Sequence, residues 1–235
     1  MLAVLKKELR SYFTSVIGYV FLVLYLVLAA LILSYTTLFS MTANVAPFFN
    51  IMIFVSAIVL PLLTMKSFSE ERKAKTEQLL LTAPVSIIGI VFGKFLAAYT
   101  LFAGCIVLNT LYCLILLNYA SLKVGVLFGC MVAVLLVGMV YIAIGLFVSA
   151  LTENQLTAAV GTMGIILLFL GIGLVSMLIP SNYGIRYVFN FLSIFTRFQA
   201  FVSGYFDLAS VVYYISVAAI FMYLTVRIYD RRRYN

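Results

Sequence analysis

Three observations predict that this chain is an all-α polytopic membrane protein. It is expected to form a single transmembrane domain over residues 1–235, with six transmembrane helices. Hydrophobic residues make up 66% of the chain and charged residues only 9%, unlike the balance of a soluble domain. A helix needs about 20 mostly apolar residues to span a bilayer, and the charges fall in the gaps between stretches of about that length or longer. These stretches, which contain no Asp, Glu, Lys or Arg, are residues 11–65, 95–122, 124–152, 154–185 and 208–226. The first is long enough for two crossings, which brings the expected number of spans to six.

Residues 1–15 are expected to form an amphipathic helix that lies in the membrane interface. Leu2, Leu5 and Leu9 recur at helical spacing, with Lys6 and Arg10 on another side. The apolar run that follows is too long for the apolar region of a secretory signal peptide. Residues 16–39 are therefore predicted to form the first transmembrane helix.

The second span is expected at 45–65, where Pro47 suits the first helical turn. The next segment, 67–84, carries many charges and is predicted to form a helix outside the membrane core. Ser69 can cap this helix, acidic residues follow in its first turn, and Pro84 closes it. Such a rigid projection is either a docking element for a partner or a solvated connector.

The remaining spans are expected at 95–117, 124–150, 156–179 and 208–228, separated by short polar turns. Between the last two, residues 183–207 are rich in Phe and Tyr, but Arg186 and Arg197 interrupt them too often for a span. Aromatic residues with scattered charge suit the headgroup region of a bilayer. We therefore expect short interfacial or re-entrant helices there, serving as an outer anchor or as a gate.

The distribution of basic residues predicts the orientation of the chain. Cytoplasmic loops of membrane proteins carry an excess of Lys and Arg. If both termini are cytoplasmic, only Lys123, Arg186 and Arg197 of the 15 basic residues fall on the outer side. The formal charge of +8 is therefore interpreted as a topology signal of a cell-membrane protein and not as a nucleic-acid site.

The sequence offers few groups for catalysis. It contains no His, which removes His-dependent proteases and acyltransferases. The segment from Gly89 to Lys94 has three residues between its glycines and no Ser or Thr after its lysine, so it does not form a phosphate loop. We expect no enzyme activity, metal or bound cofactor on this chain, and any ATP would bind to another chain. The spans lack the ionisable groups that ion-coupled carriers usually place at mid-membrane depth, but a carrier or channel remains the alternative class.

Small residues mark the helix faces that can approach a neighbour closely. Gly89 and Gly93 form one such pair, Gly125 and Gly129 a second, and Gly138 with Gly145 a third. These faces are expected to pack within one subunit or at a subunit interface.

Several motifs resemble the permease subunits of type-2 ABC transporters. They are Glu70-Glu71-Arg72, Thr76-Glu77 followed by Leu79-Leu80, then Pro84, and finally Gly93-Lys94. The family commonly has Gly before the Thr, where this chain has Lys75. The similarity continues in residues 149–155 and in 198–214. Within the family, the chain looks most like the gliding-motility and copper-processing type of permease.

This resemblance implies a function and a set of partners. Two six-span permease subunits, identical or different, would pair around a central path and act as an exporter. Because apolar and aromatic residues with few fixed charges would line that path, we expect lipid-like, hydrophobic or peptide cargo. Helix 67–84 would be the coupling helix that docks in a separate cytoplasmic ATPase, present in two copies and carrying ATP and magnesium. An auxiliary subunit with an extracytoplasmic domain is a further expected partner. The coupling residues would be Glu70, Glu71, Arg72, Lys75, Glu77 and Glu153, and the outer gate would contain Arg186, Arg197, Gly204 and Asp207.

Overall fold

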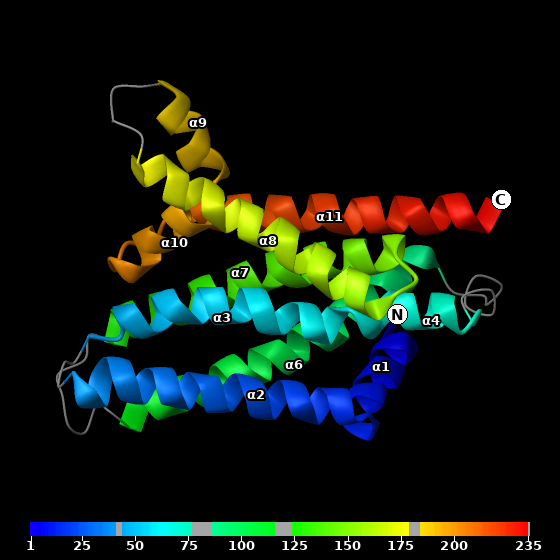
Figure 1. The fold of residues 1–235 in the computed structure, drawn as a ribbon, viewed down its shortest axis with the longest axis horizontal. Coiled ribbons are helices and arrows are strands. Elements are labelled where there is room, and N and C mark those ends of the chain that lie inside the picture. The colour runs from blue at the N-terminus through cyan, green and yellow to red at the C-terminus, as the bar shows by residue number, and fades with distance from the viewer. Residues whose placement is uncertain (41–43, 77–85, 116–123, 179–183, 235) are drawn as a thin grey trace.

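The computed structural model describes residues 1–40, 44–76, 86–115, 124–178 and 184–234, and every regular element within these ranges is helical (Figure 1). The described residues contain six helices that are long and apolar enough to cross a membrane. The predicted fold class, an all-α protein with six candidate spans, is therefore confirmed. These spans are Val16–Thr37, Ala46–Lys73, Ile87–Leu114, Val124–Leu151, Gln155–Ser176 and Leu208–Arg233.

Helix α7 (Val124–Leu151) forms the centre of the bundle. It packs against α3 (Ala46–Thr64), α6 (Ile87–Ile115), α8 (Gln155–Leu178) and α11 (Leu208–Tyr234). Helix α2 (Val16–Leu33), which continues into the π-helix η1 (Ser34–Phe39), packs against α3 and α6 at the edge of the bundle.

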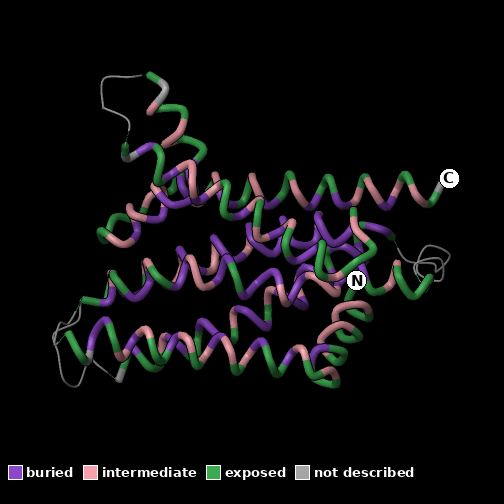
Figure 2. Tube along the Cα trace, viewed as in Figure 1, coloured by how far each residue is buried: buried purple, intermediate pink, exposed green. Residues whose placement is uncertain are grey.

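The outer surface of the bundle carries many large apolar side chains. Figure 2 shows buried positions where the helices meet and exposed positions on the outside. Exposed positions include Val23, Leu168 and Leu178, whose accessible fractions are 62%, 70% and 83%. Patches of this extent are rare on soluble monomers, whereas lipid is an apolar solvent for them. The chain is thus a multi-pass membrane protein.

The two ends of the bundle carry different structures. Helices α1 (Leu2–Thr14) and α4 (Lys66–Lys73) and both termini lie at one end, called here the α4 end (Figure 1). The short helices α9 (Gly184–Leu192) and α10 (Ile194–Val202), together called here the hairpin, meet at a bend at the other end, called the hairpin end. The turn from α1 into α2 requires a glycine at position 18, because a Cβ atom on Gly18 would lie 2.1 Å from the carbonyl oxygen of Tyr12.

Helix α6 begins earlier than the sequence predicts. The span was expected from residue 95, but α6 starts at Ile87, so Lys94 lies inside the helix and is buried. The sequence reasoning ended the span at a charge, since an unpaired ammonium is costly among apolar groups. In the structure other side chains neutralise Lys94, and the apolar run before it continues the helix.

Two glycines allow α7 to approach its neighbours closely. A Cβ atom on Gly138 would lie 2.0 Å from the ring of Phe102 on α6. One on Gly145 would lie 2.1 Å from the hydroxyl of Thr64 on α3. No side chain larger than hydrogen therefore fits at either position unless the facing side chain or its helix moves.

The other predicted glycine pairs differ in their surroundings. A Cβ atom on Gly93 would lie 2.9 Å from the side chain of Val4 on α1, and one on Gly89 would lie 3.6 Å from the nitrogen of Met1. Gly129 faces α10, whereas a Cβ atom on Gly125 would meet nothing within 4 Å. Apart from Gly125, the glycines of all three predicted pairs therefore face other segments of the same chain.

We expect Gly138→Ala to lower the free energy of unfolding by about 1–3 kcal/mol, because the added methyl group overpacks the contact with Phe102. Thermal unfolding of the purified protein in detergent would measure this. Gly164→Ala is the matched control, since a Cβ atom there meets nothing within 4 Å. Equal melting temperatures for the two variants would contradict the close approach of α6 and α7.

Candidate functional site

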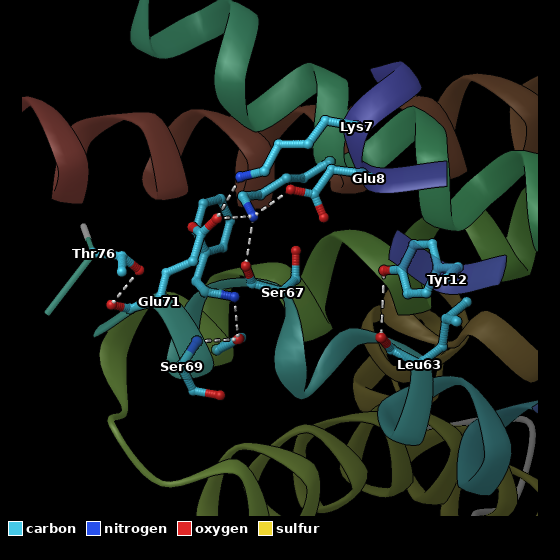
Figure 3. A network of polar contacts seen from close by, with 11 residues as sticks. Lys7, Glu8, Tyr12, Leu63, Ser67, Ser69, Glu71 and Thr76 are labelled. Carbon is cyan, nitrogen blue, oxygen red and sulfur yellow. Dashed lines mark hydrogen bonds and ion pairs between the residues drawn. The ribbon is translucent and has the colours of Figure 1, made fainter. Parts of the chain in front are cut away.

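A buried lysine joins three helices at the α4 end. The ammonium of Lys94 on α6 lies 2.9 Å from Oε1 of Glu8 on α1 and 2.9 Å from Oε1 of Glu71 on α4. It also donates a hydrogen bond of 2.7 Å to the carbonyl oxygen of Ser67. Only 1% of the Lys94 side chain is exposed. Figure 3 shows Glu8, Ser67 and Glu71 converging on this one ammonium group.

Three oxygens surround the Lys94 ammonium. Those of Glu8 and Ser67 accept hydrogen bonds, and that of Glu71 forms an ion pair with it. The ring of Phe68 lies 5.1 Å from the nitrogen and adds a cation–π contact. Lys7 approaches Glu71 at 3.6 Å, so two ammonium groups balance the two carboxylates. A buried charge is retained where its partners are complete, and we call Lys7, Glu8, Glu71 and Lys94 the lysine cluster.

A serine from α7 stabilises the start of α4. The Ser149 hydroxyl accepts hydrogen bonds from the backbone N–H groups of Phe68 and Ser69, both at 3.1 Å, and donates to the carbonyl of Met65 at 3.2 Å. The first N–H groups of a helix lack partners within it, and Ser149 provides them from another helix. The predicted capping role of Ser69 is wrong, because α4 begins at Lys66 and the Ser69 hydroxyl donates to the carbonyl of Met65.

Helix α4 ends at Lys73 in a motif that closes its last turn. The N–H of Lys75 bonds to the carbonyl of Arg72 at 3.1 Å, and the N–H of Thr76 bonds to that of Glu71 at 3.0 Å. This is the Schellman pattern, which places one residue in the left-handed region. That residue is Lys75, with φ of 56°, at the position where the resembling family commonly has Gly. The helix expected over 67–84 is therefore interrupted here, and Glu77 lies outside the described residues.

The loop between α7 and α8 is tied to α4 by an ion pair. Nη2 of Arg72 lies 2.9 Å from Oε1 of Glu153, and Nη1 donates to the carbonyl of Leu151 at 2.9 Å. Arg232 on α11 donates to the neighbouring carbonyl of Ala150 at 2.8 Å. Cations stabilise the carbonyls at a helix C-terminus, so two arginines hold the end of α7.

The predicted coupling residues differ in where they point. The side chain of Glu70 is 53% exposed and that of Glu153 is 65% exposed, whereas that of Glu71 is only 17% exposed. Glu70 contacts Lys66 on its own helix at 3.6 Å, and Lys73 is exposed. The structure thus separates an inward set, Glu71 and Arg72, from an outward face that carries Glu70 and Lys73.

Three of the four residues predicted for an outer gate lie in or beside one cluster at the hairpin end. The Arg197 guanidinium lies 5.0 Å from the ring of Phe191 and 4.4 Å from that of Tyr213. Gly204 has a φ of +86° in the turn before α11. Arg186 lies on α9, and no hydrogen bond or ion pair among the described residues joins it to this cluster.

Asp207 caps the start of α11. It accepts hydrogen bonds from the N–H groups of Ala209 and Ser210, both at 3.1 Å. The bond from the Ser210 hydroxyl contributes most to lowering the pKa of Asp207 below its usual value, and the two N–H groups act in the same direction. A carboxylate at this position also interacts favourably with the helix dipole. The first turn of α11 is therefore fixed to the turn that follows the hairpin.

Sequence reasoning missed the central role of Lys94 and the contribution of Glu8. Lys94 was treated as a charge at the edge of the membrane, and Glu8 was given no role. The sequence does contain one indication, because Lys94 lies between two apolar runs. A charge in such a place has a high free-energy cost in the membrane unless it has a function or a partner. What the sequence could not supply was the partner, because Glu8 and Glu71 are far from Lys94 along the chain.

Lys94→Met should lower the free energy of unfolding by about 3–5 kcal/mol, because it removes the cation that pairs with Glu8 and leaves Glu71 only the more distant, exposed Lys7. Lys66→Met is the matched control and should cost less than about 0.5 kcal/mol, since its pair with Glu70 is solvated. Both values can be obtained from unfolding in detergent. The triple variant Lys94→Met, Glu8→Gln and Glu71→Gln should recover part of the loss. Similar losses for Lys94→Met and Lys66→Met would show that the lysine cluster does not stabilise the fold.

Comparison with known proteins shows which family the chain belongs to. A family model described as "ABC-2 family transporter protein" matches residues 2–232. A search of the curated proteins finds no match. The family match covers nearly the whole chain and includes the site at the α4 end. The chain therefore belongs to the ABC-2 family of transporter proteins and is a membrane permease of that family.

Proposed function

We propose that this chain is the membrane-spanning subunit of an ATP-driven exporter and docks a separate cytoplasmic ATPase on α4 and the α7–α8 loop. The ion pair between Arg72 and Glu153 carries this proposal, because it joins two segments distant in sequence into one surface. The outward face beside it carries Glu70, Lys73 and Glu153. ATP and magnesium would be held by the ATPase, which is present in two copies.

The orientation in this proposal puts the α4 end in the cytoplasm. Support comes from the basic residues there, including Arg231, Arg232 and Arg233 in the last turn of α11. Cytoplasmic segments carry such an excess. The two termini, α1 and α4 would then lie on the side where ATP is available.

Contacts within the site suggest how a movement of α4 would change the positions of the membrane-spanning helices. Glu71 connects α4 to α6 through Lys94, Lys94 connects onward to α1 through Glu8, and Ser149 connects α4 to α7. Three elements would therefore respond together when the ATPase moves α4. ATP can favour one conformation of the complex only if it binds that conformation more tightly than the other. The contacts of α4 would transmit this preference to the spans.

The hairpin of α9 and α10 would act as the gate on the outer side. Polar contacts hold it to the bundle. Gln199 on α10 donates to Asn50 on α3 at 2.8 Å, and Tyr214 on α11 donates to the carbonyl of Ile194 at 2.9 Å. The bond from Tyr214 is buried, so a movement of the hairpin would have to supply a new partner for it.

The remaining parts of the proposal concern partners and subtype. A second permease subunit, identical or different, would complete the path, and an auxiliary subunit with an extracytoplasmic domain is a further candidate. The motifs around α4 favour the gliding-motility and copper-processing type. An ion-coupled carrier or channel is the alternative, and it predicts transport by this chain without an ATPase.

Purification from the native membrane in mild detergent, followed by mass spectrometry, tests the proposal directly. A near-stoichiometric soluble ATPase would support it. Repeated purification of the chain alone, with flux after reconstitution without ATP, would favour the carrier or channel.

Reversing the outward charges tests the docking surface. We expect the double variant Glu70→Lys and Lys73→Glu to reduce ATPase activity in the reconstituted complex by about tenfold, since like charges across an interface disfavour it. These side chains are outside the lysine cluster, so the fold should remain intact. Arg233→Glu is the control at the same end of the bundle and should leave the activity near that of the unmodified complex. Unchanged activity in the double variant would remove α4 as the docking element.

A further inference from the structure

An apolar groove opens between α6 and α11 toward the α4 end of the bundle. Its volume is about 540 Å³. Small residues on α11, Ala218 and Ala219, lie between larger side chains and so leave space. The other apolar residues lining it are Ile88, Phe92 and Phe95 of α6, Met139 of α7, and Ile215, Met222 and Val226 of α11.

The length of the groove matches the depth of one lipid leaflet. The apolar part of its lining runs along α11 from Ile215 to Val226, which is about 17 Å at 1.5 Å per residue. Half of the hydrocarbon core of a bilayer is about 15 Å. An acyl chain lying along the groove would therefore place its headgroup near Arg227.

The end of the groove near the end of α11 carries one positive and one negative group. Arg227 is positioned by Tyr223, whose hydroxyl accepts a 2.8 Å hydrogen bond from Nε and whose ring lies 5.4 Å from the guanidinium. Its Nη groups have no acceptor among the described residues. Asp230 also lines the groove and, in the described part of the chain, makes no ion pair within 4.0 Å. Arg231 lines a neighbouring hollow instead.

We propose that this groove binds a phospholipid whose headgroup carries an ammonium beside the phosphate, as in phosphatidylethanolamine. One acyl chain occupies the apolar part of the groove. The phosphate binds the free Nη groups of Arg227, since a guanidinium matches phosphate geometry. The ammonium lies against Asp230, which explains an acid beside an arginine without an ion pair between them. The positive charge of Arg227 and the negative charge of Asp230 thus both pair with opposite charges in one zwitterionic headgroup.

The absence of Trp from the chain allows a direct test by fluorescence. Phe92→Trp puts a single Trp in the groove, where the native side chain is 41% exposed, and Trp can be excited selectively over Tyr. The protein is reconstituted in phosphatidylglycerol vesicles that contain increasing fractions of phosphatidylethanolamine with brominated acyl chains, which quench Trp. The same measurement is made with brominated phosphatidylglycerol added to phosphatidylethanolamine vesicles. Quenching should show a preference of about three- to tenfold for phosphatidylethanolamine, as expected for one additional ion pair.

Four variants in the Phe92→Trp background define the site. Asp230→Asn should abolish the headgroup preference, and Arg227→Gln should reduce the affinity for phosphatidylethanolamine. Ala219→Phe fills the groove and should also abolish the preference. Ile220→Phe is its control, because Ile220 is the next residue on α11, is 57% exposed and does not line the groove.

A separate control reports ordinary lipid contact. Val20→Trp lies on α2, away from the groove, where Val20 is 50% exposed, and it should show no headgroup preference. Equal quenching by both lipids at Phe92→Trp, or a preference for phosphatidylglycerol, would overturn the proposal. If Ala219→Phe kept the preference for phosphatidylethanolamine, the lipid would not be bound in this groove. The measurement needs no ATPase, so its failure would leave the proposed transport function untouched.

Discussion

The burial of one charged group, the ammonium of Lys94, constrains the whole α4 end of the protein. An isolated charge in an apolar interior is strongly unfavourable, so the neighbouring helices must deliver oxygens to it. Glu8 of α1 and Ser67 and Glu71 of α4 do so within 2.9 Å. This requirement constrains the positions of α1 and α4 relative to the bundle. It acts together with apolar packing, in which Val4 of α1 lies against Gly93 and Phe68 of α4 is fully buried.

The break between α3 and α4 depends on a second polar group. Ser149 from α7 accepts the N–H groups of Phe68 and Ser69, which start the short helix. The same α7 presents Gly138 and Gly145 to α6 and α3, where any Cβ atom would collide. Close packing and capping therefore come from one helix. In the proposed mechanism, a movement of α4 would be transmitted through groups that are already in direct contact.

Two arginines beside aromatic rings serve different purposes in the bundle. At the hairpin end, Arg197 is enclosed by Phe191 and Tyr213 and serves the internal structure. On α11, Arg227 is positioned by a single tyrosine and keeps its outer donors available. Among the described residues each arginine donates one hydrogen bond, from Nε, so the difference lies in how far each is covered. Arg197 is half-buried between two rings, whereas Arg227 is exposed and can be reached by an anion.

The sequence by itself determined the all-α class and the approximate positions of the six apolar helices, because span length and the cost of charge in lipid are local properties. It also identified the segment 67–84 as special through its charges. The tertiary structure alone decided that Lys94 lies inside α6, that Glu71 points inward to it, and that Arg72 pairs with Glu153. Lys94 and Arg72 find partners far away along the chain, and no periodicity in a single segment encodes such a meeting. Only packing of the helices brings those partners together.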